Sequence, residues 1–269
     1  MTRRLPRRIA CLSTETVEVL YLLGEQERIA GISGFTVRPP RARKEKPRIS
    51  GFSTARLDKI LAVEPDLVLA FSDLQADMAR DLVKAGIAVH VFNQRDVEGI
   101  LAMVETVGRL VGAQARAEAL VAELEATIAR VRVEAATRLL PGLRRPRVYF
   151  EEWDEPLISG IRWASELIAL AGGEDVFADQ SHAQAGKSRI IADPLEVVRR
   201  APDVIIGSWC GKHFRPEQLV ARPGWAEVPA VRAGRVHEIK SAVILTPGVG
   251  AIAEGLPALA GLLAPVPAG

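Results

Sequence analysis

The feature that most constrains the fold is a long helical pattern near the middle of the chain. Residues 113–140 contain neither glycine nor proline and are rich in alanine, glutamate, arginine and leucine. Within them Leu120, Leu124, Ile128 and Val131 recur every three or four residues, as on the apolar stripe of an amphipathic helix. At 1.5 Å per residue such a helix is about 40 Å long. That is long for a helix packed inside one lobe, so the stretch predicts a strut joining two lobes.

Short apolar runs alternate with helical patterns on both sides of this stretch. The predicted strands cover residues 8–13, 28–33, 66–72, 88–93, 147–152, 203–208 and 235–240. The predicted helices cover residues 14–24, 55–65, 73–86, 96–112, 163–173, 194–202 and 249–263. This alternation indicates an α/β fold with largely parallel sheets. We therefore predict an N-terminal α/β lobe over residues 1–112, a connecting long helix over 113–140 and a C-terminal α/β lobe over 141–269.

The two halves contain a segment of the same design. LDKILAVEPDLVLAFSD (57–73) and PLEVVRRAPDVIIGSWC (194–210) both read as a helix, a Pro-Asp pair, a buried strand and a polar-aromatic loop. Ligands of parallel α/β sheets bind beyond the carboxyl ends of the strands. Residues 71–73 and 208–210 are therefore predicted to be facing walls of one cleft.

Composition argues against several classes of protein. A net charge of +2 is too balanced for a nucleic-acid-binding protein. Cys11 and Cys210 lie in unlike contexts, which argues against a disulfide framework. After the basic start MTRRLPRR only IACL precedes polar residues, and a signal peptide needs about 7–15 apolar residues. The sequence as written predicts a cytoplasmic protein, or a periplasmic one if a leader was removed or the start is mis-assigned.

Motifs for catalysis and metal binding are weak. The sequence has no HExxH, CxxC or GxSxG motif. Cys210 and His213 are three residues apart, but a zinc site needs three or four protein ligands. Lys212 and His213 could activate the Cys210 thiol, yet nothing places an oxyanion hole. We predict no metal site, no cofactor and no catalysis.

The aromatic residues are few, but several follow predicted strands or lie in loops. Tryptophan in a loop either packs as a cap or holds a flat ligand. Core packing is the alternative for each residue alone, whereas repeated placement at the same end of both lobes favours binding. The aromatic candidates for ligand binding are Phe52, Phe71, Trp153, Trp163 and Trp209.

Several segments together resemble a known family. TETVEVLYLLG, RIAGIS, LDKILAVEPDLVLA, DPLEVVRRAPDVIIG and AVRAGRVHEI are similar to segments of the helical-backbone (class III) substrate-binding proteins of ABC importers. These proteins carry cobalamin, haem and iron-siderophore complexes, and the resemblance runs from about residue 8 to residue 265. EEWDEPLISGIRWASELIALAGG and GSWCGKHFRPEQLVARPGWAEVPAVRAGRVHEIK resemble a branch of cobalamin-binding proteins.

The resemblance implies two lobes joined by one long helix, with a ligand between them. Phe52 and Phe71 match positions where aromatic side chains stack against a corrin, and Trp163 and Trp209 fall in the second-lobe cleft region. We expect Asp154, Ser208 and Lys212 to contact peripheral amides of the ligand, and Cys210 or His213 to approach its metal.

Two alternatives remain open at this point. For an anionic iron chelate such as a siderophore, or for haem, Arg162, Arg189 and Lys212 would clamp carboxylates. A cytosolic enzyme or chaperone would act on a corrinoid through Cys210.

The resemblance also implies a partner, since each lobe of such proteins offers an acid to an ABC permease. Asp58 matches the first position, whereas Leu195 occupies the second and Glu196 follows it. We expect a monomer that binds a corrinoid or iron chelate and has Asp58 and Glu196 as candidate docking residues.

Overall fold

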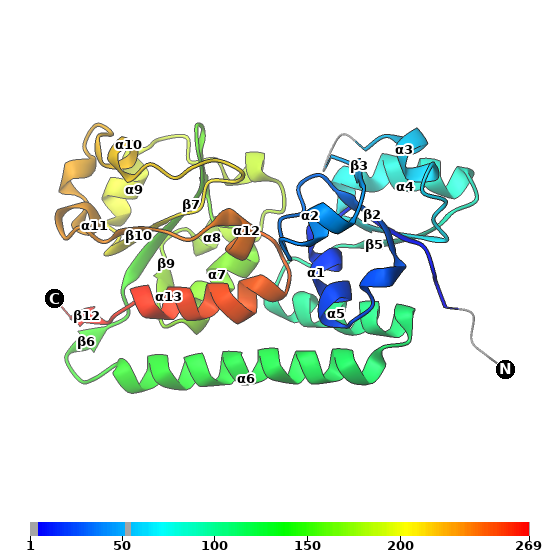
Figure 1. Ribbon diagram of the computed structural model, residues 1–269. Helices are drawn as coiled ribbons and strands as arrows, with labels where there is room; N and C mark the ends of the chain where they lie inside the picture. The colour runs from blue at the N-terminus through cyan, green and yellow to red at the C-terminus, as the bar shows by residue number, and fades with distance from the viewer. Residues whose placement is uncertain (1–4, 52–54, 269) are drawn as a thin grey trace. The chain divides into compact units, whose positions relative to one another are not determined.

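The computed structural model describes residues 5–51 and 55–268. The chain forms two compact units, each with its own core. The first comprises residues up to Gln94 together with 98–123, and the second comprises 95–97 together with the chain from Leu124 onward. Helix α6 (Gln114–Arg138) begins in the first unit and ends in the second (Figure 1). The predicted long helix is therefore present.

The first unit is built on a five-stranded parallel sheet in the order β3-β2-β1-β4-β5. Its strands are β1 (Ile9–Cys11), β2 (Ile29–Ser33), β3 (Arg48–Ser50), β4 (Leu67–Phe71) and β5 (Ala88–Phe92). The central strands β1 and β4 are buried along their whole length. This agrees with their continuous apolar sequences, because a strand covered on both faces does not alternate.

Helices and single turns connect and cover these strands. The helices are α1 (Thr14–Leu22), α2 (Ala42–Glu45), α3 (Leu57–Leu61), α4 (Ala76–Lys84) and α5 (Val97–Val111), with 3₁₀ turns η1 (Gln26–Arg28) and η2 (Asp73–Gln75). Between α5 and α6 the chain turns at Gly112, which has a φ of +74°. Gly108 of α5 lies so close to Ala117 of α6 that a side chain there would overlap it. The small residues thus let these consecutive helices pack closely.

The second unit has a sheet in the order β11-β10-β7-β8, with β9 also paired to β7. Its strands are β7 (Arg147–Asp154), β8 (Leu157–Ser159), β9 (Glu174–Asp175), β10 (Val204–Gly207) and β11 (Val236–Glu238). β10 is parallel to both β7 and β11, whereas β8 returns antiparallel to β7. A separate antiparallel pair joins β6 (Leu143–Arg144) to β12 (Val266–Pro267).

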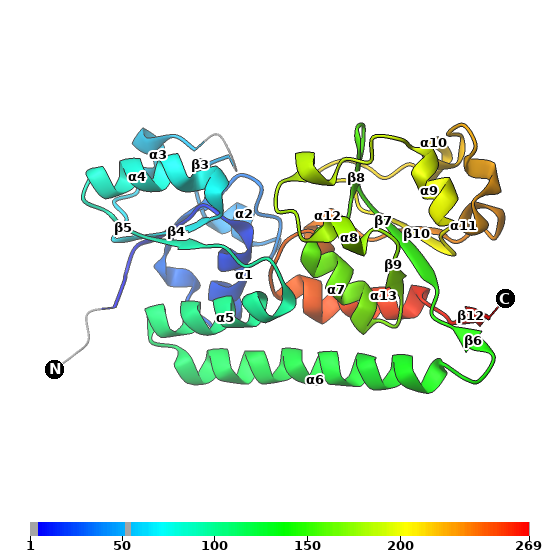
Figure 2. The same ribbon diagram turned by 180° about the vertical axis from the view of Figure 1, so that it is seen from behind.

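Short helices surround this second sheet (Figure 2). They are α7 (Arg162–Leu170), α8 (Ala178–Ser181), α9 (Leu195–Arg200), α10 (Pro216–Val220), α11 (Pro229–Arg232), α12 (Ser241–Ile244) and α13 (Leu256–Leu262). Single turns η3 (Gly186–Arg189), η4 (Trp225–Glu227) and the π-helical η5 (Ala251–Gly255) complete the unit. No helix among the described residues is long and apolar enough to span a membrane.

The repeated segment has the same local structure in both units. The Asp66 carboxylate accepts a hydrogen bond from the backbone N–H of Arg8, just before β1, at 3.0 Å. The backbone N–H of Asp66 in turn donates a hydrogen bond to the Arg8 carbonyl. The Asp203 carboxylate accepts a hydrogen bond from the backbone N–H of Arg147, at the start of β7, at 2.7 Å. The backbone N–H of Asp203 likewise donates to the Arg147 carbonyl. In each unit the carboxylate therefore ties the incoming strand to its neighbour. The predicted fold class, two α/β units with mostly parallel sheets and one long connecting helix, is confirmed.

Candidate functional site

The clearest cluster of predicted site residues lies in the second unit, beyond the carboxyl ends of β7 and β10. The two strands are parallel and in register, with Gly207 opposite Glu151. Past this point the Ser208 N–H donates to the Glu151 carbonyl at 2.9 Å, and the Cys210 N–H donates to the Glu152 carbonyl at 3.2 Å. This pairing brings Trp153, Asp154, Ser208, Trp209, Cys210 and Lys212 together, as expected of one sheet edge.

Lys212 is the centre of this cluster. Its ammonium lies 2.6 Å from the Asp154 carboxylate. The same nitrogen lies 5.1 Å from the centre of the Trp153 ring and 5.0 Å from that of Trp209, within cation–π range. Gly211 makes this placement possible because it adopts a φ of +69°, a conformation that side chains disfavour. The result is an ion pair that lies against two indole rings, with the Lys212 side chain 41% exposed and the Asp154 side chain 11% exposed.

Trp209 departs from the prediction of a stacking wall. Its side chain is only 1% exposed and packs edge-on against Phe214, with ring centres 5.1 Å apart. The indole N–H donates to Glu151 at 2.8 Å, so the ring is held inside the unit. A buried carboxylate thus supplies the partner that the indole N–H requires, and the ring presents no open face in this structure.

Trp163 is also buried inside the second unit. It is 3% exposed, and its indole N–H donates to the carbonyl of Ile244 in α12 at 2.9 Å. Trp163 therefore fastens α7 to α12 and offers no stacking face. Trp153 differs, because its ring is partly exposed and its N–H donates to the Glu155 carbonyl at 2.8 Å.

Ser208 and Cys210 have contrasting surroundings. The Ser208 hydroxyl is buried and has no hydrogen-bond partner within the described part of the chain. Cys210 is free and exposed, and desolvation together with the nearby Glu152 raises the pKa of its thiol. No group of three or more His, Cys, Asp or Glu side chains among the described residues could hold a metal ion.

The arginines expected to clamp an anionic chelate are already paired within the second unit. Arg189 is 1% exposed and makes a two-pronged ion pair with Glu152, with N···O distances of 2.7 and 3.1 Å. Arg162 lies 2.9 Å from Glu166 and 3.2 Å from Asp96. Arg189 is therefore a structural residue that supports β7, and the sequence could not show this because its partner is distant along the chain.

In the first unit the predicted aromatic residues do not form a comparable cluster among the described residues. Phe71 ends β4 and is only 5% exposed, so the expected open face is absent. Phe52 lies outside the described residues.

Two exposed side chains beside the same strand ends were missed: Phe35, 63% exposed after β2, and Leu74, 64% exposed after β4. The repeated sequence ISGF, at 32–35 and 49–52, could have indicated Phe35.

A buried carboxylate lies near these strand ends. Glu15 of α1 is 3% exposed, and desolvation raises its pKa to about 6. It accepts a hydrogen bond from the Thr14 hydroxyl at 3.3 Å and one from the Gln94 amide at 3.5 Å. Nothing in the sequence pattern singles out this group, because glutamate is rarely buried in proteins.

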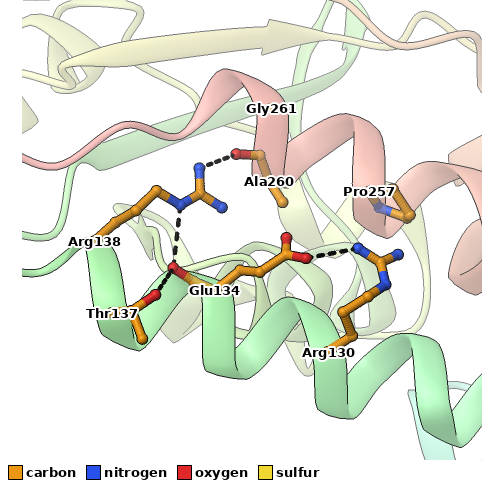
Figure 3. Close-up of a pocket in the computed structure, with 7 residues that line it drawn as sticks. All are labelled: Arg130, Glu134, Thr137, Arg138, Pro257, Ala260 and Gly261. Carbon is orange, nitrogen blue, oxygen red and sulfur yellow. Dashed lines mark hydrogen bonds and ion pairs between the residues drawn. The ribbon is translucent and has the colours of Figure 1, made fainter.

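A groove of about 430 Å³ lies elsewhere in the second unit, between α6 and α13. Figure 3 shows its polar lining, in which Arg130 pairs with Glu134 at 2.9 Å and Arg138 donates to the Ala260 carbonyl at 2.8 Å. Figures 1 and 2 place α6 below the start of β7, whereas the β7–β8 turn is at the opposite end. Arg138 therefore links α6 to α13, whereas the Arg130–Glu134 pair lies within α6.

The candidate docking residues are also paired. Asp58 on α3 is 63% exposed and lies 2.6 Å from Arg56, which lowers the pKa of its carboxyl. Glu196 on α9 pairs with Arg199 at 2.7 Å and with Arg200 at 2.9 Å. Leu195 beside it is 45% exposed.

Two largely parallel sheets with polar and aromatic groups beyond their strand ends are an arrangement typical of ligand-binding proteins. The chain belongs to the periplasmic binding protein family, whose model matches residues 9–243.

Named relatives support this membership. The chain is 29% identical over 202 residues to a cobalamin-binding protein of Halobacterium salinarum, covering 72% of this chain and 53% of that one. The chain thus spans about half the length of that relative. It is 25% identical over 250 residues to a vitamin B12-binding protein of Vibrio campbellii, covering 87% and 82%. A periplasmic haem-binding protein of Pseudomonas aeruginosa has the same fold, with a TM-score of 0.82, 19% identity and coverage of 97% and 95%.

Proposed function

We propose that the chain binds a corrinoid, with cobalamin as the leading candidate, and does not transform it chemically. The observation that carries this proposal is the Lys212–Asp154 pair beside Trp153. A carboxamide has one acceptor and one donor group, and the ammonium and carboxylate of this pair match both. A corrin carries such amides around broad apolar faces.

Charge favours a corrinoid over haem. Haem has two carboxylates, which need cations free to receive them. Arg189 and Arg162 are committed to acids of the second unit, and Lys212 is neutralised by Asp154. A carboxylate would have to displace Asp154 from Lys212, whereas an amide can bind beside the pair. The names of two relatives, a cobalamin-binding and a vitamin B12-binding protein, agree with this preference.

Binding without catalysis agrees with the state of Cys210. A nucleophilic thiol needs a lowered pKa, and here desolvation and Glu152 raise it. We expect Cys210→Ser to retain corrinoid binding. Loss of binding or of a corrinoid-dependent activity would instead favour the enzyme or chaperone alternative.

Calorimetric and absorbance titration with hydroxocobalamin, haemin and a ferric siderophore tests the ligand. We expect binding of hydroxocobalamin, and binding of haemin or the siderophore alone would overturn the proposal. Lys212→Met should weaken corrinoid binding about tenfold or more, the effect of one charge-assisted hydrogen bond. Lys240→Met is the matched control, because Lys240 is an exposed lysine of the same unit that pairs with Glu238 at 2.6 Å.

Delivery of the ligand to an ABC permease is part of the same proposal. Asp58 and Glu196 are the candidate docking acids, and each lies on the helix that begins the repeated segment of its unit. Charge reversal at both positions should reduce uptake of the ligand in cells and leave its binding to the purified chain unchanged. Unchanged uptake would remove these residues from the proposal.

A further inference from the structure

Glu151 is a fully buried carboxylate near the end of β7. It accepts hydrogen bonds from three side chains: Tyr149 at 3.0 Å, Trp209 at 2.8 Å and Arg222 at 2.5 and 2.9 Å. Arg222 itself is 17% exposed and lies 4.6 Å from the centre of the Trp225 ring. All the capacity of this carboxylate is therefore used inside the unit.

The partners of Glu151 mark the two ends of one segment. Trp209 begins the segment that runs from β10 through Cys210, Lys212 and α10, and Arg222 follows α10. Between these ends the segment is held to β7 by the Cys210 N–H bond to the Glu152 carbonyl, to α12 by a bond from the Gly211 N–H to the Ser241 hydroxyl at 3.3 Å, and to the core by Phe214 and Leu219. One carboxylate thus holds both ends of the segment that carries Lys212.

Stability alone does not require this arrangement. A buried ion pair gives little net stability compared with apolar side chains of the same shape, whereas its geometry can select one conformation. Arginine also binds a carboxylate through two parallel bonds, which fixes direction as well as distance.

We propose that Glu151 is a positioning residue, which fixes the conformation of residues 209–222 and so places Lys212 for the ligand. The part of this inference that concerns the ligand rests on the proposed function. The part that concerns the conformation does not, because the exposed Cys210 thiol reports on the segment directly.

Two variants test the inference. Glu151→Gln offers only one acceptor oxygen and leaves Arg222 without a counter-charge. Arg222→Lys keeps the charge but loses the two-pronged geometry, so it decides the matter should Glu151→Gln fail to fold. Glu125→Gln, at an exposed position of α6, is the control.

The first measurement is alkylation of Cys210 by iodoacetamide, far below the denaturation midpoint of each variant. We expect at least a fivefold faster reaction in the folded variants, together with a red shift of tryptophan emission as Trp209 loses its buried partner. Wild-type rates in both variants, or rates that rise only with global unfolding, would overturn the inference.

The second measurement is hydroxocobalamin affinity, which should fall at least tenfold in Arg222→Lys. An unchanged affinity beside faster alkylation would show that the segment does not place the ligand contacts. If wild-type protein binds no corrinoid, the proposed function fails, and the alkylation rates still decide whether Glu151 positions the segment.

Discussion

The two cysteines of this chain should differ sharply in reactivity. Cys11 is buried in β1, and desolvation raises its pKa to about 12. Cys210 is exposed, with a pKa raised above its ordinary 9.0. In native protein we expect one thiol to react with a disulfide reagent, more rapidly as pH rises, and the second to react only after unfolding. Cys210→Ser should abolish the native reaction, and two fast native thiols would contradict this.

At the same scale, Glu15 should make stability depend on pH. Its pKa is raised from 4.5 to about 6 in the folded chain because burial disfavours the charged form. The folded state therefore holds the proton more tightly, and the resulting stability is fully present below pH 4.5 and lost as pH rises through about 6.

Replacing this group should reverse the loss. Glu15→Gln should stabilise the first unit by about 2 kcal/mol at pH 7.5, since one pKa unit corresponds to about 1.4 kcal/mol. Urea unfolding at pH 4.5 and 7.5 measures this, with Glu118→Gln on the exposed face of α6 as control. A variant less stable than wild type at pH 7.5 would show that Glu15 is ionised and compensated.

At the scale of elements, the packing at the end of β10 requires a glycine, Gly207, which has no side chain. A Cβ on Gly207 would overlap the ring of Phe214, which packs directly over the strand. Gly207→Ala should cost about 1–3 kcal/mol, the range for overpacking a core. Denaturant unfolding should show this loss, and Phe214→Leu in the same chain should recover part of it.

Gly261→Ala in α13 is the matched control, because nothing lies within 4 Å of the added carbon. It should be neutral or slightly stabilising, as for alanine replacing glycine in a helix. Equal losses in both variants would mean that backbone conformation, and not contact with Phe214, decides the effect.

Most helices and strands could be predicted from the sequence alone. β1, β4 and β10 can be read from the sequence because each is an uninterrupted apolar run, and β7 because residues 148–150 form an apolar core between charged residues. α6 can be read because its apolar stripe continues without glycine or proline. β9, of two residues, is too short to leave a periodic pattern.

Side-chain environments were harder to predict than elements. Trp209 and Arg189 were assigned to the ligand because their partners, Glu151 and Glu152, lie far away in sequence. Residues at strand ends can be located from a pattern, but whether they face inward depends on contacts between distant segments. The Lys212–Asp154 pair was likewise expected only as two separate contacts.

At the scale of the whole molecule, replacing the equivalent aspartates of the repeated segment should destabilise both units, but by unequal amounts. Asp66 is exposed and bonds the backbone N–H groups of Arg7 and Arg8, at 2.7 and 3.0 Å. Asp203 bonds the Arg147 N–H and also the Arg144 guanidinium, at 2.6 and 3.1 Å, and its side chain is only 12% exposed. Asp203→Ala should therefore cost about 2–3 kcal/mol and Asp66→Ala about 1 kcal/mol.

Hydrogen exchange read unit by unit measures where each loss falls. Because each unit has its own core and each carboxylate ties a strand of its own sheet, Asp66→Ala should speed exchange in β1 and β4, and Asp203→Ala in β7 and β10. Exchange that rises equally in both sheets for either variant would mean that the two halves unfold as one cooperative body. The shared helix α6 would then transmit stability between them, whereas separate responses would make each repeat an independently stabilised half.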